Sequence, residues 1–82
     1  MGQDITDRVR QIVAEQLGIG EGEVRVSSSF TDLGADSFAV VEMVLALEEA
    51  FEVEIADTET ERLRTVGDAI GFVVTARQRQ GR

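Results

Sequence analysis

The chain has 82 residues, 43% of them hydrophobic, with 16 acidic and 8 basic side chains and a formal net charge of −8. This length suits one small domain, here expected to cover residues 1–82, and the apolar content excludes a disordered chain. Cysteine and histidine are both missing, which excludes a disulfide framework, a cysteine-ligated metal site and histidine-based acid–base catalysis.

The charges are segregated along the chain. Ten of the acidic residues lie between positions 32 and 61, and all eight bases, every one an arginine, lie outside that stretch. A surface of one sign repels nucleic acid and attracts basic protein partners, although acidity also keeps any small protein soluble. No apolar run suits a membrane span or a secretory signal. We therefore expect a cytoplasmic protein without membrane contact, and we expect it to be a monomer.

Residues 4–17 have the apolar spacing of an amphipathic helix. The residues of its stripe recur mainly at steps of three and four: Ile5, Val9, Ile12, Val13 and Leu17. Asp4 is a suitable N-cap, and Gly18 is a suitable residue to end the helix in a left-handed conformation. We therefore predict a first helix over this range.

Residues 18–35 form a long connection that is rich in glycine and serine. Val24 and Val26 alternate with a polar residue as in a β-strand, but one strand alone has no partner to pair with. We therefore predict an extended loop, which the two valines and Phe30 hold against the core.

A second helix is predicted over residues 37–51, after a corner at Gly34 and Asp36. The glycine permits a sharp turn, and the Asp36 carboxylate can accept a backbone N–H of the first turn. Ser37 then takes the first helical position, beside unpaired N–H groups and the positive end of the helix dipole, which favours a phosphate. The simpler interpretation is that Asp36 and Ser37 do no more than cap the helix.

This second helix is apolar over more than half of its circumference. One stripe of four residues is widened by three further apolar side chains: Val40, Val44, Leu47 and Phe51, then Val41, Met43 and Leu45. Such a helix is either buried at the centre of a bundle, or shares part of its surface with a partner or an attached group.

Two more helices complete the predicted fold. A short third helix is expected over residues 58–63 with Asp57 as its cap, and residues 65–68 resemble a capping box before a fourth helix that ends near Arg77. Residues 78–82 are expected to form a polar, frayed tail. Three long helices and one short helix predict an all-α, small four-helix bundle, with a long loop between helices 1 and 2.

Several of these segments together resemble acyl carrier proteins. The run Phe30-Thr31-Asp32-Leu33-Gly34-Ala35-Asp36-Ser37 is similar to the signature of that family, and residues 41–44, 46–51 and 65–70 are similar to its later segments. The resemblance implies that Ser37 receives a 4′-phosphopantetheine arm from coenzyme A, through a phosphopantetheinyl transferase that recognises Asp36. It further implies that acyl thioesters on this arm are delivered to the enzymes of a discrete fatty-acid or polyketide synthase, such as an acyltransferase or a ketosynthase.

The resemblance also implies that partner enzymes with basic patches bind the second helix. The residues expected to face them are Phe38, Val41, Glu42, Met43, Glu48 and Glu49. The chain departs from the common fatty-acid carrier pattern at Phe38, where leucine is usual, at Ala39, where an acid is usual, and at Ala56, where proline is usual. These departures leave fatty-acid, polyketide and other specialised pathways open.

Other functions fit the sequence less well. An enzyme would have to rely on carboxylates, because lysine is missing along with histidine and cysteine, and we therefore expect a carrier rather than an enzyme. Asp32 and Asp36 lack the alternating acids of a calcium loop, so no metal site is expected. An acidic helical interaction bundle without a prosthetic group, and a peptidyl or aminoacyl carrier, stay as alternatives.

Overall fold

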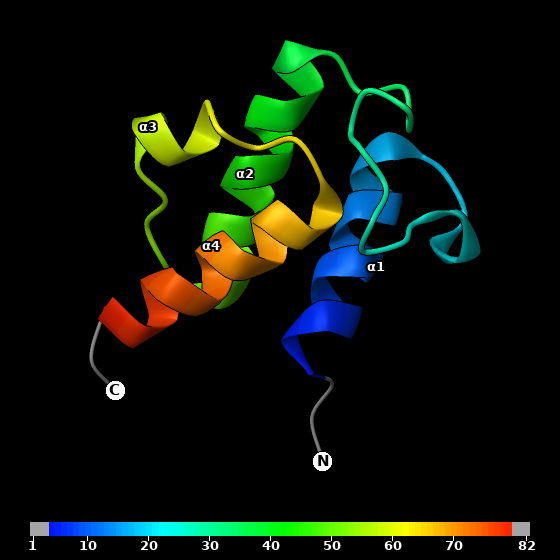
Figure 1. The fold of residues 1–82 in the computed structure, drawn as a ribbon. Coiled ribbons are helices and arrows are strands. Elements are labelled where there is room, and N and C mark those ends of the chain that lie inside the picture. Colours follow the sequence, from blue (N-terminus) through cyan, green and yellow to red (C-terminus); the bar gives the residue numbers. More distant parts are fainter. Residues whose placement is uncertain (1–3, 80–82) are drawn as a thin grey trace.

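The computed structural model describes residues 4–79, and the regular elements within that range are helices. They are α1 (Ile5–Leu17), the short 3-10 helix η1 (Glu21–Glu23), α2 (Ser37–Phe51), α3 (Asp57–Thr60) and α4 (Val66–Arg79). The helix α1 packs against α2 and α4, and α2 also packs against α4 (Figure 1). The predicted all-α bundle, with three long helices, one short helix and a long loop after the first, is confirmed.

The helix α1 begins and ends where its sequence indicates. The Asp4 carboxylate accepts a hydrogen bond from the backbone N–H of Asp7 at 2.9 Å. Gly18 ends the helix in the left-handed region, with φ at 68°, a conformation that strains residues with a side chain. Both predicted helix ends are therefore confirmed.

The core is built from apolar side chains that come from α1, the long loop, α2, the link to α3, and α4. The buried residues are Val9, Ile12, Val13, Ala14, Val24, Phe30, Met43, Val44, Leu47, Val53, Ile55, Val66, Ala69, Val73 and Ala76. Among residues 4–79, no polar or charged residue is buried to the same degree. Burial of apolar surface is therefore the main force that holds the helices together.

The loop between α1 and α2 finds a pairing partner just before α4. Ser29 and Thr65 form an isolated antiparallel bridge, and the backbone N–H of Phe30 donates to the carbonyl of Arg64 at 2.9 Å. Sequence reasoning missed this partner, because the segment before α4 is too short to show a strand pattern of its own. The pairing ties the corner before α2 to the start of α4.

The two valines of this loop behave differently. Val24 is fully buried, as predicted, but the Val26 side chain is 48% exposed, so its predicted anchoring role is wrong. The chain turns at Val26, whose carbonyl accepts a hydrogen bond from the backbone N–H of Gly67 at 2.9 Å. A Cβ atom on Gly67 would lie 3.2 Å from that carbonyl oxygen. The absence of a side chain at Gly67 therefore lets the loop lie against the first turn of α4.

The helix α3 is shorter than predicted. It runs over Asp57–Thr60 with Ala56 as its N-cap residue, so the expected helix over residues 58–63 with an Asp57 cap is wrong at both ends. Alanine offers no side-chain acceptor to the first turn, but the Glu59 carboxylate accepts the Ala56 N–H at 3.3 Å. The same carboxylate lies 3.0 Å from the guanidinium of Arg79 on α4. One acidic side chain thus holds α3 to the end of α4.

The capping box at the start of α4 is confirmed. The Asp68 N–H donates to the Thr65 hydroxyl at 3.1 Å, and the Thr65 N–H donates to the Asp68 carboxylate at 3.2 Å. The helix continues to Arg79, so residues 78 and 79 are helical, and the rest of the expected tail lies outside the described residues. No helix within residues 4–79 is long and apolar enough to cross a membrane.

Candidate functional site

The corner before α2 has the geometry that the sequence predicts. Gly34 has φ at 89°, in the region that favours glycine. The backbone of Asp36 is extended, and its carboxylate accepts a hydrogen bond from the N–H of Ala39 at 2.8 Å. Ser37 follows as the first residue of α2, and it is exposed. The structure therefore presents a primary hydroxyl at the beginning of a long, capped helix.

Two backbone donors beside this hydroxyl are open. Within the described part of the chain, the N–H groups of Ser37 and Phe38 donate no hydrogen bond, which is ordinary for the first turn of a helix. The positive end of the helix dipole lies at the same place. An anionic group on the Ser37 oxygen therefore meets hydrogen-bond donors and a favourable local potential.

The preceding loop fixes this corner in position. The Ala35 N–H donates to the carbonyl of Phe30 at 2.9 Å, and the Gly34 N–H donates to the carbonyl of Thr31 at 3.0 Å. Phe30 is almost completely buried, and Leu33 is half-buried against the core. These contacts agree with the expectation that Phe30 anchors the loop, and they hold Ser37 at a defined point on the surface.

Ser37 opens onto a cleft of about 540 Å³. It is lined by residues 29–31 and 35–37 with Val40 and Val41, and by residues 60, 61, 63 and 64. The cleft therefore combines apolar side chains of the loop and α2 with polar and charged side chains around the link between α3 and α4. A flexible group attached to Ser37 has room to lie in it.

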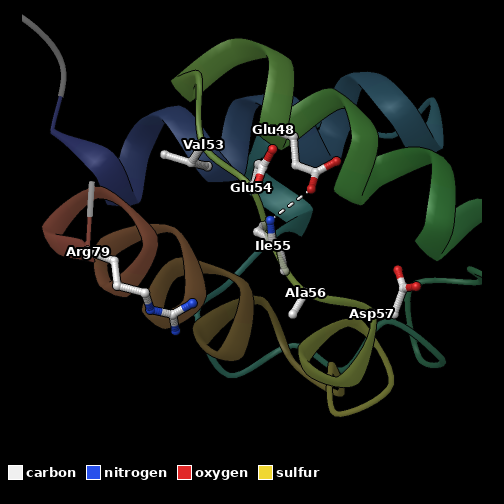
Figure 2. Close-up of a pocket in the computed structure, with 7 residues that line it drawn as sticks. All are labelled: Glu48, Val53, Glu54, Ile55, Ala56, Asp57 and Arg79. Carbon is white, nitrogen blue, oxygen red and sulfur yellow. Dashed lines mark hydrogen bonds between the residues drawn. The ribbon is translucent and has the colours of Figure 1, made fainter.

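Figure 2 shows a second pocket, of about 470 Å³, where Glu48 faces the link to α3 and Arg79 projects from α4. The Glu48 carboxylate accepts a hydrogen bond from the backbone N–H of Ile55 at 2.8 Å, and Glu48 is half-buried. Ser37 does not line this pocket. Glu48 therefore braces the link between α2 and α3, which sequence reasoning did not foresee for a residue expected to face partners.

The other residues expected to bind partners divide into two groups. Met43 has no exposed surface, so its expected contact with a partner is wrong, because its side chain packs in the core. Phe38 is 69% exposed and Val41 is 47% exposed, while Glu42 and Glu49 are also at the surface. The structure thus leaves four of the six residues open to a partner.

Leu45 is a surface residue that the expected partner set lacked. Its side chain is 58% exposed, and it follows Phe38 and Val41 at the spacing of one helix face. We call Phe38, Val41 and Leu45 the apolar stripe of α2. The sequence shows that Leu45 lies at helical spacing from Phe38. It does not show which face of the helix is buried, because apolar residues surround both.

Comparison with known proteins shows which family model and which solved structures the chain resembles. Residues 7–73 match the family model described as a phosphopantetheine attachment site. The fold is similar to that of an acyl carrier protein from Thermotoga maritima, with 29% identity and a TM-score of 0.79 over 89% of this chain and 86% of that one.

Two further carrier proteins have similar structures. One is the hexanoyl form of the acyl carrier protein from the actinorhodin polyketide synthase of Streptomyces coelicolor, with 25% identity and a TM-score of 0.75 over 85% of this chain and 86% of that one. The other is an apo doublet acyl carrier protein from prodigiosin biosynthesis, with 24% identity and a TM-score of 0.76 over 87% of this chain and 35% of that one.

The class is therefore that of carrier domains, and the chain belongs to the family of the phosphopantetheine attachment site. Its fold is similar to that of acyl carrier proteins. Members of this family are carriers without catalytic activity of their own. Their fold implies interaction with a phosphopantetheinyl transferase and with synthase enzymes. The expected cofactor, phosphopantetheine, agrees with the matched family model.

Proposed function

We propose that Ser37 is the attachment point of the phosphopantetheine arm, and that the chain presents acyl thioesters to the enzymes of a discrete fatty-acid or polyketide synthase. The observation that carries this proposal is the exposed Ser37 hydroxyl at the capped start of α2, beside open N–H groups and a cleft. It lies within the segment that matches the attachment-site family.

Nearby serines are weaker candidates for the attachment. The Ser28 hydroxyl accepts the N–H of Arg25 at 3.0 Å, and the Ser29 hydroxyl accepts the N–H of Asp32 at 2.9 Å. Both hydroxyls thus serve turns of the loop, whereas the Ser37 hydroxyl has no hydrogen-bond partner within residues 4–79. Ser27 is exposed but lies outside any helix start.

The residues around Ser37 fit the proposed group. When attached, the arm supplies a terminal thiol on which acyl groups are carried as thioesters. Among the residues of the chain, the N–H groups of Ser37 and Phe38 are placed to donate hydrogen bonds to a phosphate at the Ser37 oxygen. Asp36 keeps the helix start ordered and offers a negative charge to a transferase.

We further propose that partner enzymes bind α2 through the apolar stripe together with the exposed carboxylates of Glu42 and Glu49. A partner suited to this surface has an apolar pocket with basic residues around it. The stripe gives contact area, while the carboxylates raise the rate of encounter at low salt. Glu48 is left out of this surface, because its carboxylate is engaged by Ile55.

The likeness to the actinorhodin carrier, together with Phe38, Ala39 and Ala56, supports polyketide assembly as the first pathway to test, with fatty-acid synthesis as the alternative. Identification of the thioester on the protein isolated from its native cells distinguishes the two. A saturated acyl chain favours fatty-acid synthesis, and a chain with retained keto groups favours a polyketide.

Loading of the arm tests the attachment site. We expect the apo-protein, incubated with coenzyme A and a phosphopantetheinyl transferase, to gain the mass of one arm, and the Ser37→Ala variant to gain nothing. Intact-mass spectrometry gives the result, and Ser27→Ala is the matched control that still accepts the arm. If wild type stays unmodified while an established carrier is loaded in the same mixture, the acidic interaction bundle without a prosthetic group becomes the better account.

A further inference from the structure

Arg64 has a backbone that is fixed on both sides by hydrogen bonds. Its N–H donates to the Asp68 carboxylate at 3.1 Å, and its carbonyl accepts the N–H of Phe30 at 2.9 Å. These contacts do not involve the guanidinium, so the side chain can change without loss of either hydrogen bond. The position of Arg64 relative to the corner before α2 is therefore set by the backbone.

Arg64 is the basic residue among those that line the cleft containing Ser37, and it is exposed to solvent. Figure 1 shows the link between α3 and α4, on which Arg64 lies, passing in front of α2. The acidic residues of the same lining are Asp36 and Glu61. One basic residue and the residue with the exposed hydroxyl thus line the same cleft.

The guanidinium of Arg64 has no partner among residues 4–79. Two other arginines are engaged: Arg10 bonds to the carbonyls of Val24 and Glu21, and Arg79 pairs with Glu59. No comparable hydrogen bond or ion pair holds the side chain of Arg64 within the described residues, although two carboxylates line the same cleft. The Arg64 guanidinium is therefore available to bind an anionic group that is attached to the chain later.

The chemistry of the arm supplies such an anion. Its phosphodiester, attached through the Ser37 oxygen, carries one negative charge on its non-bridging oxygens. The Asp36 carboxylate belongs to the preceding residue, in the most acidic part of the sequence. Neighbouring like charges repel, and an opposite charge in the same cleft offsets the repulsion. A guanidinium can donate two parallel hydrogen bonds to phosphate oxygens, which an ammonium cannot match in geometry.

We propose that Arg64 binds the phosphodiester of the arm and holds the first part of the arm in the cleft between α2 and the link from α3 to α4. This proposal rests on the proposed attachment at Ser37. Arg64 is a positioning residue for the arm and takes no part in the transfer of acyl groups. Because the pair is exposed to solvent, the contact weakens as salt is added.

Nuclear magnetic resonance of the loaded protein tests this contact directly. The samples are apo and holo wild type, together with holo Arg64→Gln, Arg64→Lys and Arg62→Gln. Arg62 is an exposed neighbour that does not line the cleft, so Arg62→Gln removes a charge close by without removing the contact. The readouts are the ³¹P signal of the phosphodiester and the Nε–Hε signal of Arg64.

We expect the Arg64 Nε–Hε signal to shift when the arm is added, and to return toward its apo position in high salt. We expect the ³¹P signal to move in Arg64→Gln, to move less in Arg64→Lys, and to stay at the wild-type position in Arg62→Gln. An Arg64 signal that is identical in apo and holo wild type overturns the proposal, even if Arg64→Gln were poorly folded. Equal ³¹P shifts in Arg64→Gln and Arg62→Gln overturn it as well.

Failure of this contact and failure of the attachment site are distinguishable. If intact mass shows an arm on Ser37 but the Arg64 signals do not respond, attachment at Ser37 stands and the role of Arg64 is wrong. If no arm is added to Ser37, the attachment site itself is wrong.

Discussion

Asp36 gives the corner before α2 two separate properties. Its carboxylate satisfies the N–H of Ala39 and leaves those of Ser37 and Phe38 open, so the helix is capped without closing the site. Its negative charge also lies beside the proposed attachment oxygen, in the cleft that Arg64 lines. The cap and the charge can be separated by substitution, because asparagine caps a helix about as well as aspartate does.

We expect Asp36→Ala to lower the free energy of unfolding by about 1 kcal/mol, since the Ala39 N–H loses its acceptor. Asp36→Asn keeps most of this stability but is loaded more slowly by the transferase, because the charge is lost. Urea denaturation of the apo-proteins and loading rates give the two results. Asp32→Ala is the control for stability, since Asp32 is exposed and its carboxylate accepts no hydrogen bond within residues 4–79. Equal stability of Asp36→Ala and Asp32→Ala contradicts the cap.

The boundaries of the helices were predictable where neighbouring residues set them. The caps at Asp4 and Asp36 and the box formed by Thr65 and Asp68 each join residues that are three apart, so the sequence contains the whole interaction. The start of α3 was not predictable in the same way. Its N-cap residue is alanine, which is not a usual cap, although Glu59 three residues on accepts the Ala56 N–H. Glu59 also bonds to Arg79, twenty residues away. Contacts between distant segments leave no local pattern to read.

The contact between the long loop and α4 gives a prediction about two glycines of the same helix. Gly67→Ala is expected to lower the free energy of unfolding by about 1 kcal/mol or more, because its Cβ would press on the Val26 carbonyl at 3.2 Å. Gly71→Ala is expected to raise it by about 0.5–1 kcal/mol, since nothing lies within 4 Å and alanine favours a helix. Thermal and urea unfolding measure both, and a stabilising Gly67→Ala shows that the loop does not depend on this close approach.

Over the whole molecule, the surface of α2 was the hardest feature to predict. Large apolar residues cover so much of this helix that periodicity alone does not decide which of them face the core. Met43 is buried and Leu45 is exposed, and only the packing of α1 and α4 around α2 makes that choice. Ser37 and Asp36 were found because their signal lies in a short motif. The partner surface was predicted only in part, because it consists of the α2 residues that remain exposed once α1 and α4 have packed against this helix.

The mixed surface of α2 predicts two kinds of loss in partner binding. The double variant Glu42→Arg and Glu49→Arg is expected to bind a basic partner enzyme with a lower association rate at low salt, and to approach wild type as salt screens the charges. Leu45→Ala is expected to raise the dissociation rate at every salt concentration, because it removes apolar contact area. Surface plasmon resonance with the holo-protein gives both rates.

Glu48→Gln is the matched control for the charge variants, because the amide oxygen can still accept the Ile55 N–H. It is expected to change the association rate less than the equivalent single variants Glu42→Gln and Glu49→Gln do. If Leu45→Ala binds as wild type does while the charge variants lose all binding, the apolar stripe is not part of the interface.

The most direct measurement locates the arm on protein isolated from its native cells. Trypsin cleaves after Arg25 and Arg62 and gives one peptide of residues 26–62, because no base lies between them. This peptide contains Ser27, Ser28, Ser29 and Ser37, so fragmentation in the mass spectrometer assigns the modified oxygen among all four. We predict the phosphopantetheine mass on Ser37 alone. The same mass on one of the loop serines, or a peptide that is never modified, contradicts the account.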